Sequence, residues 1–312
     1  MNQIYRKSPF WSLAGPMLGY LAIQFVVQFA AQLVIEMPYV MRAYAEILRG
    51  SSDTVPSMQE LLNSYMQTLE PAFEAIVRYQ VEIAALSALG TIVLTGILFA
   101  RDRKLEEKIG VVLPEKAPLS KYWTVVIFGI AGCIAATCLM AMVQLAFYDE
   151  QYQQTAQITY SAGLLVQIIG LGIITPIAEE LMFRGILYKR FRERQGFWYS
   201  ALWSSLLFSF MHSNTTQMVY TFLLGVLLSY LYEKFGSFKA PLVLHILLNT
   251  GSVVFTELGV FRYLAGSPAR MAGAVIAGAF LCSVMFVVIQ RMPVRIESRL
   301  NTNDTDRHDM FS

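Results

Sequence analysis

Charged side chains are scarce in this sequence of 312 residues. Lys, Arg, Asp and Glu make up 15% of it, whereas soluble globular proteins usually carry about 25%. Hydrophobic residues make up 55%, and the mean hydropathy is +0.49. This composition argues against a cytosolic globular enzyme and predicts a polytopic membrane protein whose apolar surface is covered by lipid.

The sequence also lacks three other features: an excess of one charge, paired cysteines and a zinc-protease motif. The 24 basic and 22 acidic residues leave a net charge of +2, which is too balanced to indicate a nucleic-acid partner. The cysteines lie in apolar runs without a C-x-x-C pair, which predicts packing residues rather than disulfides: Cys133, Cys138 and Cys282. The absence of H-E-x-x-H disfavours a helix-borne zinc site.

Long apolar runs are what the sequence has instead. A helix needs about 20 residues to cross roughly 30 Å of hydrocarbon. The fifth, sixth and seventh runs are short, so tilted, buried or partly re-entrant helices are expected there. We predict an all-α polytopic membrane protein with about eight transmembrane helices, at Ser12 to Ile35, Ile83 to Ala100, Tyr122 to Tyr148, Ile158 to Ala178, Phe197 to Met211, Met218 to Tyr232, Leu242 to Phe255 and Met271 to Ile289.

A single integral membrane domain over residues 1–300 is the simplest organisation, because nothing repeats at a fixed period. Within it, residues 36–79 form a polar insert in which Gly50-Ser51-Ser52-Asp53 separates two helix-like stretches. This pattern predicts an extracytoplasmic helical hairpin. Residues 158–256 carry the motifs described below, and the polar residues 301–312 predict a disordered cytoplasmic tail.

The distribution of Lys and Arg predicts the orientation. If the N-terminus is inside, the outer segments hold only Arg42, Arg49, Arg78, Arg262 and Arg270 of the 24 basic residues. The positive-inside rule then places both termini in the cytoplasm, and an even number of crossings agrees with that. We expect an integral protein of the bacterial cell membrane.

Ionisable groups within the apolar runs are few, and each is a candidate for function because it is costly in lipid. Glu179, Glu180 and Arg184 close the fourth run, just after Pro176, which should kink or loosen the helix. Glu180 and Arg184 are four residues apart and should form an ion pair. Glu179 should point about 100° away. The alternative is an ordinary helix end at the membrane interface.

Two of the three histidines also lie in or at the end of apolar runs, whereas His308 lies in the tail. His245 and Asn249 are four residues apart and therefore share a helix face. One His can share a proton with a carboxylate and a water, and a His with an Asn can stabilise a developing oxyanion. Hydrogen bonds between packed helices are the alternative role for His212 and His245.

In this order, Glu179-Glu180-x-x-x-Arg184, Phe208-x-x-x-His212 and His245-x-x-x-Asn249 resemble the three motifs of the CAAX protease and bacteriocin-processing (CPBP, or Abi) family of intramembrane endopeptidases. The resemblance covers roughly Ile158 to Thr250, about a third of the chain. It implies an eight-helix fold with a polar intramembrane cavity that opens toward the cytosol.

The resemblance also implies the roles of the site residues. Glu179 and His212 would activate a water, and His245 and Asn249 would stabilise the tetrahedral oxyanion. Glu180 and Arg184 would be structural or positioning residues, and Phe208 would pack at the cavity wall. It favours a glutamate-type peptidase without a cofactor. A catalytic zinc held by Glu179, His212 and His245 is the alternative.

The expected partners are the lipid bilayer and a membrane-associated peptide or protein substrate. The substrate can be a prenylated CAAX tail, a pheromone, a bacteriocin leader or another membrane protein, and the oligomeric state is open. A non-catalytic scaffold, immunity or peptide-binding protein would use the same polar cluster. One geometric tension is present, because His212 lies about 22 Å along its helix from Phe197, whereas Glu179 is expected near the cytoplasmic end of its own helix.

Overall fold

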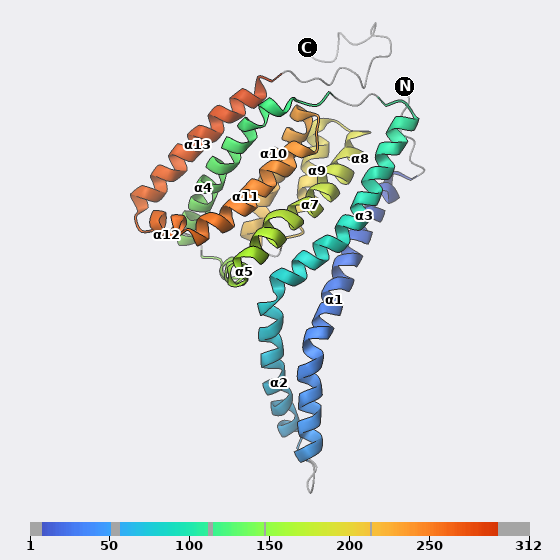
Figure 1. Cartoon of the computed structure of the whole chain (residues 1–312), viewed down its shortest axis with the longest axis vertical. Coiled ribbons are helices and arrows are strands. Elements are labelled where there is room, and N and C mark those ends of the chain that lie inside the picture. The colour runs from blue at the N-terminus through green and yellow to red at the C-terminus, as the bar shows by residue number, and fades with distance from the viewer. Residues whose placement is uncertain (1–7, 51–56, 112–114, 147, 213, 293–312) are drawn as a thin grey trace.

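The computed structural model describes residues 8–50, 57–111, 115–146, 148–212 and 214–292, and in these residues it is all helical, without a strand (Figure 1). The all-α prediction is confirmed. The helices are α1 (Pro9–Gly50), α2 (Met58–Arg78), α3 (Gln80–Lys108), η1 (Leu119–Lys121), α4 (Trp123–Ala146), α5 (Glu150–Ser161), α6 (Leu164–Val166), η2 (Gln167–Ile174), α7 (Thr175–Glu180), η3 (Leu181–Tyr188), α8 (Lys189–Arg192), α9 (Phe197–Ser209), α10 (Thr215–Phe235), α11 (Lys239–Glu257), α12 (Val260–Ala265) and α13 (Pro268–Gln290).

Seven of the described helical stretches are long and apolar enough to cross a membrane. The fifth predicted span corresponds to α9, whose 13 residues extend only about 20 Å at 1.5 Å per residue. The sixth and seventh runs are longer than predicted, since α10 and α11 continue through polar residues to 21 and 19 residues. The described residues therefore contain seven candidate spans, where the sequence predicted about eight, and α9 is the predicted span that is too short to be counted.

The N-terminal hairpin extends beyond the rest of the bundle. α1 has 42 residues and is therefore about 63 Å long, roughly twice the thickness of the hydrocarbon core. α2 lies beside the second half of α1, and the pair protrudes from one end of the molecule (Figure 1). The predicted insert at residues 36–79 thus falls on the second half of α1 and on α2, and its extracytoplasmic location stays a prediction. Residues 51–56 and the predicted tail at 301–312, with His308, lie outside the described residues.

The helix that carries the first motif is continuous from Leu164 to Arg192 and contains two π-helical stretches, η2 and η3. Pro176 lies in the first turn of α7, directly after η2. Proline has no N–H to donate, so the preceding turns lack one α-helical hydrogen bond, and the wider π turns accommodate this loss. The expected loosening before the carboxylates is therefore confirmed.

The fourth predicted span is wrong at its end, because the helix does not stop at Ala178. Its last turns hold Lys189 and Arg190, which are buried and pair with carboxylates of α3. Lys189 Nζ lies 2.7 Å from Glu106 Oε2, and Arg190 Nε lies 2.8 Å from Asp102 Oδ2. Each buried cation has a buried anion beside it, so the charged segment stays within the bundle rather than forming a loop.

The two ends of the bundle differ in charge. We call the end formed by residues 101–111, 115–121, 189–196, 234–239 and 290–292 the basic end, because most Lys and Arg of the described residues lie there. Hydrogen bonds join these segments, including Ala117 N to Phe235 O (2.9 Å) and Lys234 Nζ to Gln290 O (2.8 Å). The opposite end is formed by α5, α12 and the connection from α9 to α10. The helices alternate in direction, and this brings the basic segments to one end of the bundle. The positive-inside rule expects such a gathering at a cytoplasmic face.

Candidate active site

A fully buried ion pair lies at the centre of the bundle. Arg184 Nη1 lies 2.8 Å from Glu180 Oε1, and both side chains are 0% exposed. The guanidinium also donates from Nη2 to the Gly225 carbonyl (3.1 Å) and lies over the Phe208 ring, 4.6 Å from its centroid. The i, i+4 pair expected from the sequence is confirmed, and contacts from α9 and α10 hold it in place.

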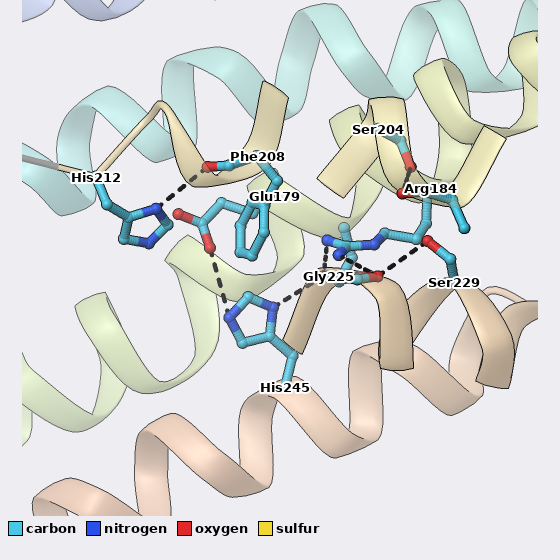
Figure 2. A network of polar contacts seen from close by, with 10 residues as sticks. Glu179, Arg184, Ser204, Phe208, His212, Gly225, Ser229 and His245 are labelled. Atoms are coloured by element: carbon cyan, nitrogen blue, oxygen red, sulfur yellow. Dashed lines mark hydrogen bonds and ion pairs between the residues drawn. The ribbon is translucent and has the colours of Figure 1, made fainter. Parts of the chain in front are cut away.

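Gly225 is a residue of this site that the sequence motifs do not include. A Cβ at this position would lie 2.7 Å from Ser205 Cβ and 3.1 Å from Arg184 Nη2, which is too close for a substituted residue. The Gly225 carbonyl also accepts a hydrogen bond from Ser229 Oγ at 3.0 Å. Glycine therefore allows α10 to approach Arg184 closely, as Figure 2 shows. A lone glycine in a helical run is the signal that could have indicated this contact.

His245 of α11 contacts both glutamates of the first motif. Its Nδ1 lies 2.9 Å from Glu180 Oε1, and its Nε2 lies 3.5 Å from Glu179 Oε2 (Figure 2). Where the Glu180 oxygen accepts in this contact, Nδ1 of His245 is the donor. Arg184, Glu180, His245 and Glu179 thus form a continuous polar chain between two helices.

Glu179 is the exposed end of this chain. Its side chain is 14% exposed, whereas that of His245 is 4% exposed and that of Glu180 is 0% exposed. Successive helical residues point about 100° apart, so the two carboxylates meet the imidazole from different directions. Glu179 retains a free approach on one side, which is the property required of a group that meets a water or a substrate.

His212 follows the end of α9, and its Nδ1 lies 3.2 Å from the Phe208 carbonyl. The buried Phe208 ring contacts both imidazoles, with centroid distances of 5.1 Å to His212 and 5.9 Å to His245. Figure 2 shows the Glu179 carboxylate between the two imidazoles. Three separate helical segments therefore bring the Glu and both His residues together, and Phe208 packs between the two imidazoles.

Glu179 and His212 lie at similar depths in the bundle, measured along their helices from the basic end. The first motif lies within the span Leu164–Arg192, so Glu179 is about 20 Å along the helix from Arg192. His212 is about 22 Å from Phe197 along the next segment. Both distances start at the basic end. The expectation that Glu179 lies near the end of its helix was wrong, because the helix continues for three turns beyond it.

Asn249 lies on α11 one turn after His245, but its amide contacts the π-helical segment. Asn249 Nδ2 donates to Leu171 O at 3.1 Å, and Thr250 Oγ1 donates to Gly172 O at 3.2 Å. A Cβ at Gly172 would lie 2.6 Å from Thr250 Oγ1. The sequence motifs omit Gly172 and Thr250. Together these contacts fasten α11 to η2 directly before the two glutamates.

The described residues contain no group of three or more His, Cys, Asp or Glu side chains arranged to hold a metal ion. In particular, both nitrogens of His245 face carboxylates, and His212 Nδ1 faces a carbonyl. The expected zinc alternative of Glu179, His212 and His245 is therefore not assembled in this arrangement. Whether the protein depends on a metal stays a prediction.

The part of the chain that carries this site is similar to a known protein family. Residues 161–251 match the family model described as "Type II CAAX prenyl endopeptidase Rce1-like". The stretch includes all seven motif residues named above, from Glu179 to Asn249. We call residues 161–251 the Rce1-like segment, because over this part the chain is similar to that family of CAAX prenyl endopeptidases. The resemblance inferred from the three motifs is confirmed.

Relatives of the Rce1-like segment are found in two bacteria. The "Putative membrane peptidase YdiL" of Bacillus subtilis (strain 168) is 28% identical over 116 residues, which are 37% of this chain and 47% of the relative. An uncharacterized 24.3 kDa protein of Escherichia coli is 32% identical over 97 residues, 30% of this chain and 45% of the relative. The chain thus spans about half the length of the curated relatives it matches. No solved structure matches the chain.

Proposed function

We propose that this protein is an intramembrane endopeptidase that hydrolyses a peptide bond with a water activated at Glu179. The observation that carries the proposal is the buried chain of Arg184, Glu180, His245 and Glu179 within the Rce1-like segment. Burying ionisable groups in a membrane bundle costs stability, so they mark a functional site by default. The peptidase family matched by this segment supports hydrolysis as that function.

In this proposal, Glu179 and His212 act on the water. The Glu179 carboxylate accepts one proton from the water while the water oxygen bonds to the carbonyl carbon of the substrate. The tetrahedral intermediate then collapses, the C–N bond breaks and the proton passes to the leaving amine. His212, on the other side of Glu179 (Figure 2), helps to orient the water and to share its proton.

His245 and Asn249 stabilise the negative oxygen of the intermediate. Because Glu180 accepts the Nδ1 hydrogen of His245, Nε2 can donate to the oxyanion only when the imidazole carries both hydrogens. Asn249 Nδ2 uses one hydrogen for Leu171 O, which leaves its second hydrogen for the substrate. Glu180 and Arg184 position His245 and do not contact the substrate.

The proposed reaction is metal-independent and uses no cofactor. Glu179 and the two histidines supply the proton acceptor and the oxyanion donor without a metal. Zinc bound by Glu179, His212 and His245 is the alternative, and it would use Nε2 of each histidine, because Nδ1 of His245 faces Glu180 and Nδ1 of His212 faces the Phe208 carbonyl. Cleavage by purified protein after exhaustive chelation, with metal content measured on the same sample, tests this part of the proposal.

The protein is an integral membrane protein, and we propose that its basic end faces the cytoplasm of a bacterial cell, with both termini on that side. The gathering of the basic segments at one end supports this orientation. The proposed partner is a membrane-associated peptide or protein substrate in the lipid bilayer, with no nucleic-acid partner. Impermeant labelling of single cysteines at the two ends tests the orientation.

The proposed function is tested with three forms of the protein: the wild type, Glu179→Gln and Glu257→Gln. Each form is expressed in cells and is also purified. Glu257 is an exposed glutamate at the end of α11 and serves as the matched control. Proteomic comparison of cells expressing each variant identifies peptides that depend on Glu179, and purified protein is then tested on them. We expect wild type and Glu257→Gln to cleave them and Glu179→Gln to fail. Equal peptide profiles for all three would support the non-catalytic alternative.

A further inference from the structure

The second half of α1 continues beyond the bundle. Ile35 lies beside Tyr79 and Ile83, at the junction between α2 and α3. From Ile35, α1 extends for about 22 Å to Gly50, at 1.5 Å per residue. Figure 1 shows this part of α1, with α2 beside it, passing the level of α5 at the end of the bundle. The hydrocarbon that covers the bundle therefore ends before the far end of these two helices.

A stripe of apolar side chains runs along α1 across this boundary, at alternating intervals of four and three residues. We call it the α1 seam, and its members are Val26, Ala30, Leu33, Met37, Val40 and Tyr44. All of these side chains are exposed. Apolar residues that recur about every 3.5 residues pack two supercoiled helices against each other. The α1 seam thus has the pattern of a coiled-coil interface, yet no described helix of the chain covers it.

The middle of the α1 seam faces away from the rest of the chain. At about 100° per residue, Leu33 and Met37 both point about 160° from Ile35, which faces the junction of α2 and α3. The two charged residues along this length, Glu36 and Arg42, point about 100° and about 20° from Ile35. The contacts within the chain and Arg42 therefore lie on one side of α1, and the uncharged seam lies on the other.

A shallow groove adjoins the α1 seam. It has a volume of about 430 Å³, and apolar side chains line it: Leu33, Val34, Met37, Pro38 and Met41. In a coiled coil, each side chain of one seam inserts into a hole formed by four residues of the facing helix. Methionine side chains adapt their shape to what they contact. The groove is therefore suited to receive an apolar side chain from a second helix.

Helix α2 adds further exposed apolar side chains beyond the bundle. Met58, Leu62 and Met66 are each four residues apart, share one face of α2 and are all more than half exposed. Among the described side chains of α2, only Ala72 is buried. Exposed apolar surface of this extent marks an interaction site where lipid does not cover it. This part of α1 and α2 therefore calls for an apolar partner from outside the chain.

A second copy of the chain matches the α1 seam in orientation, height and charge. Copies inserted in one membrane have the same orientation, so two α1 helices meet parallel and in register. Each seam residue then faces its own copy, where identical charges would repel each other, and the seam carries no charge from Val26 to Tyr44. Partners of different sequence are usually selected by complementary charges, which the seam does not offer.

We propose that the α1 seam is the surface on which two parallel copies of this chain associate in the membrane. From Val26 to Tyr44 the seam is about 27 Å long, which is short for a coiled coil in water. Because the membrane holds both copies at the same height, their effective concentration is high, and a short seam is sufficient. The inference does not depend on the proposed peptidase activity, and it assigns the oligomeric state that the sequence left open.

Disulfide cross-linking in membranes tests which face of α1 meets the second copy. Leu33→Cys, Met37→Cys and Val40→Cys place single thiols on the seam, and Arg42→Cys is the control on the side of Ile35. The wild type, with its own three cysteines, gives the background. Cysteines whose Cα atoms are more than about 7 Å apart cannot be bridged, so only seam positions should form covalent dimers after oxidation. Equal cross-linking of Arg42→Cys, or no seam dimer above background, overturns the proposal.

Charged substitutions at Val40 test whether the partner is a copy of the chain rather than another protein or lipid. Two differently tagged copies are co-expressed and extracted in mild detergent, and their co-purification is measured. Val40→Glu alone or Val40→Lys alone should lower co-purification at least about tenfold, because like charges then face each other. Co-expressed Val40→Glu and Val40→Lys copies should co-purify again, since opposite charges meet.

This rescue requires that position 40 of one copy faces position 40 of the other. Wild-type copies that do not co-purify, single charged variants that co-purify as well as the wild type, or a mixed pair that is not restored would each overturn the proposal. None of these measurements uses cleavage, so their failure is distinct from a failure of the proposed function.

Discussion

Two sets of buried charges lie on the same long helix and differ in how completely they are paired. At the basic end, Lys189 and Arg190 each have a carboxylate of α3 within 2.8 Å. One to three turns away, Glu180 and Arg184 pair with each other, yet Glu180 Oε2 and Arg184 Nε have no hydrogen-bond partner among the described residues. Complete pairing is what a structural ion pair requires, whereas unsatisfied buried groups call for an explanation such as catalysis or a bound water. The contrast supports the proposal that the second set belongs to the functional site.

The largest effect should come from the exposed end of the second set. Glu179→Gln removes the proton acceptor while keeping the side-chain volume, so cleavage should slow about 10²- to 10⁴-fold. Thermal unfolding in detergent should be almost unchanged, because Glu179 has only the 3.5 Å contact to His245. A normal rate in Glu179→Gln would remove the distinction between the two sets, and Glu257→Gln is the matched control.

Removing an ion pair at the basic end should lower the free energy of unfolding and leave the rate of cleavage unchanged. Lys189→Met removes the 2.7 Å partner of the buried Glu106 and leaves it only the 3.5 Å contact with Arg103, so the free energy of unfolding should fall, by up to about 3 to 5 kcal/mol. The folded fraction should retain normal kcat at a temperature below the transition. The double variant Glu106→Gln/Lys189→Met should be more stable than the single variant, because no unpaired charge remains. A double variant that is less stable by the sum of both single effects would contradict this pairing.

Asn249→Ala should lower kcat by about 10²- to 10³-fold, the cost of one oxyanion donor. The same change removes the hydrogen bond to Leu171 O, so a loss of stability of about 1 kcal/mol is also expected. Thr250→Val serves as the control, since it removes the neighbouring bond to Gly172 O without touching the proposed donor. If both variants lose the same activity, Asn249 acts by fastening α11 and not on the oxyanion.

The smallest effect in this series should come from the close approach of α10. Gly225→Ala inserts a methyl group between Ser205 and Arg184 and should destabilise the fold by about 1 to 3 kcal/mol. Displacement of Arg184 should also reduce kcat through Glu180 and His245, with little change in KM. Gly96→Ala, in open space on α3, is the control and should be nearly neutral. An unaffected Gly225→Ala would show that Arg184 does not depend on this contact.

Much of the site could be predicted because its parts are local. Glu180 and Arg184 are one turn apart, and Phe208 and His212 are separated by the same spacing, so helical geometry alone brings each pair together. The three motifs in order then identified the family segment. Pro176 likewise indicated the loosened turns that precede the glutamates.

The ion pairs at the basic end could not be predicted from the spacing of residues along one helix. Lys189 and Glu106 are 83 residues apart, and Arg190 and Asp102 are 88 residues apart. When the carboxylate partners are unknown, Lys189 and Arg190 are typical of a loop. The sequence therefore predicted that the helix stops at Ala178. The i, i+4 spacing of Asp102 and Glu106, matched by two adjacent cations, is the only signal in the sequence that could have suggested the pairing.

By itself, the sequence determined that the protein is a helical membrane protein with an intramembrane Glu, His and Asn set, because hydropathy and helical spacing are properties of short segments. Only the tertiary structure decided that His245 meets both glutamates, that the motif helix continues to Arg192 and that its residues 182–190 are buried. Each of these depends on side chains from different helices that neutralise or cover one another, and such contacts exist only once the helices have packed.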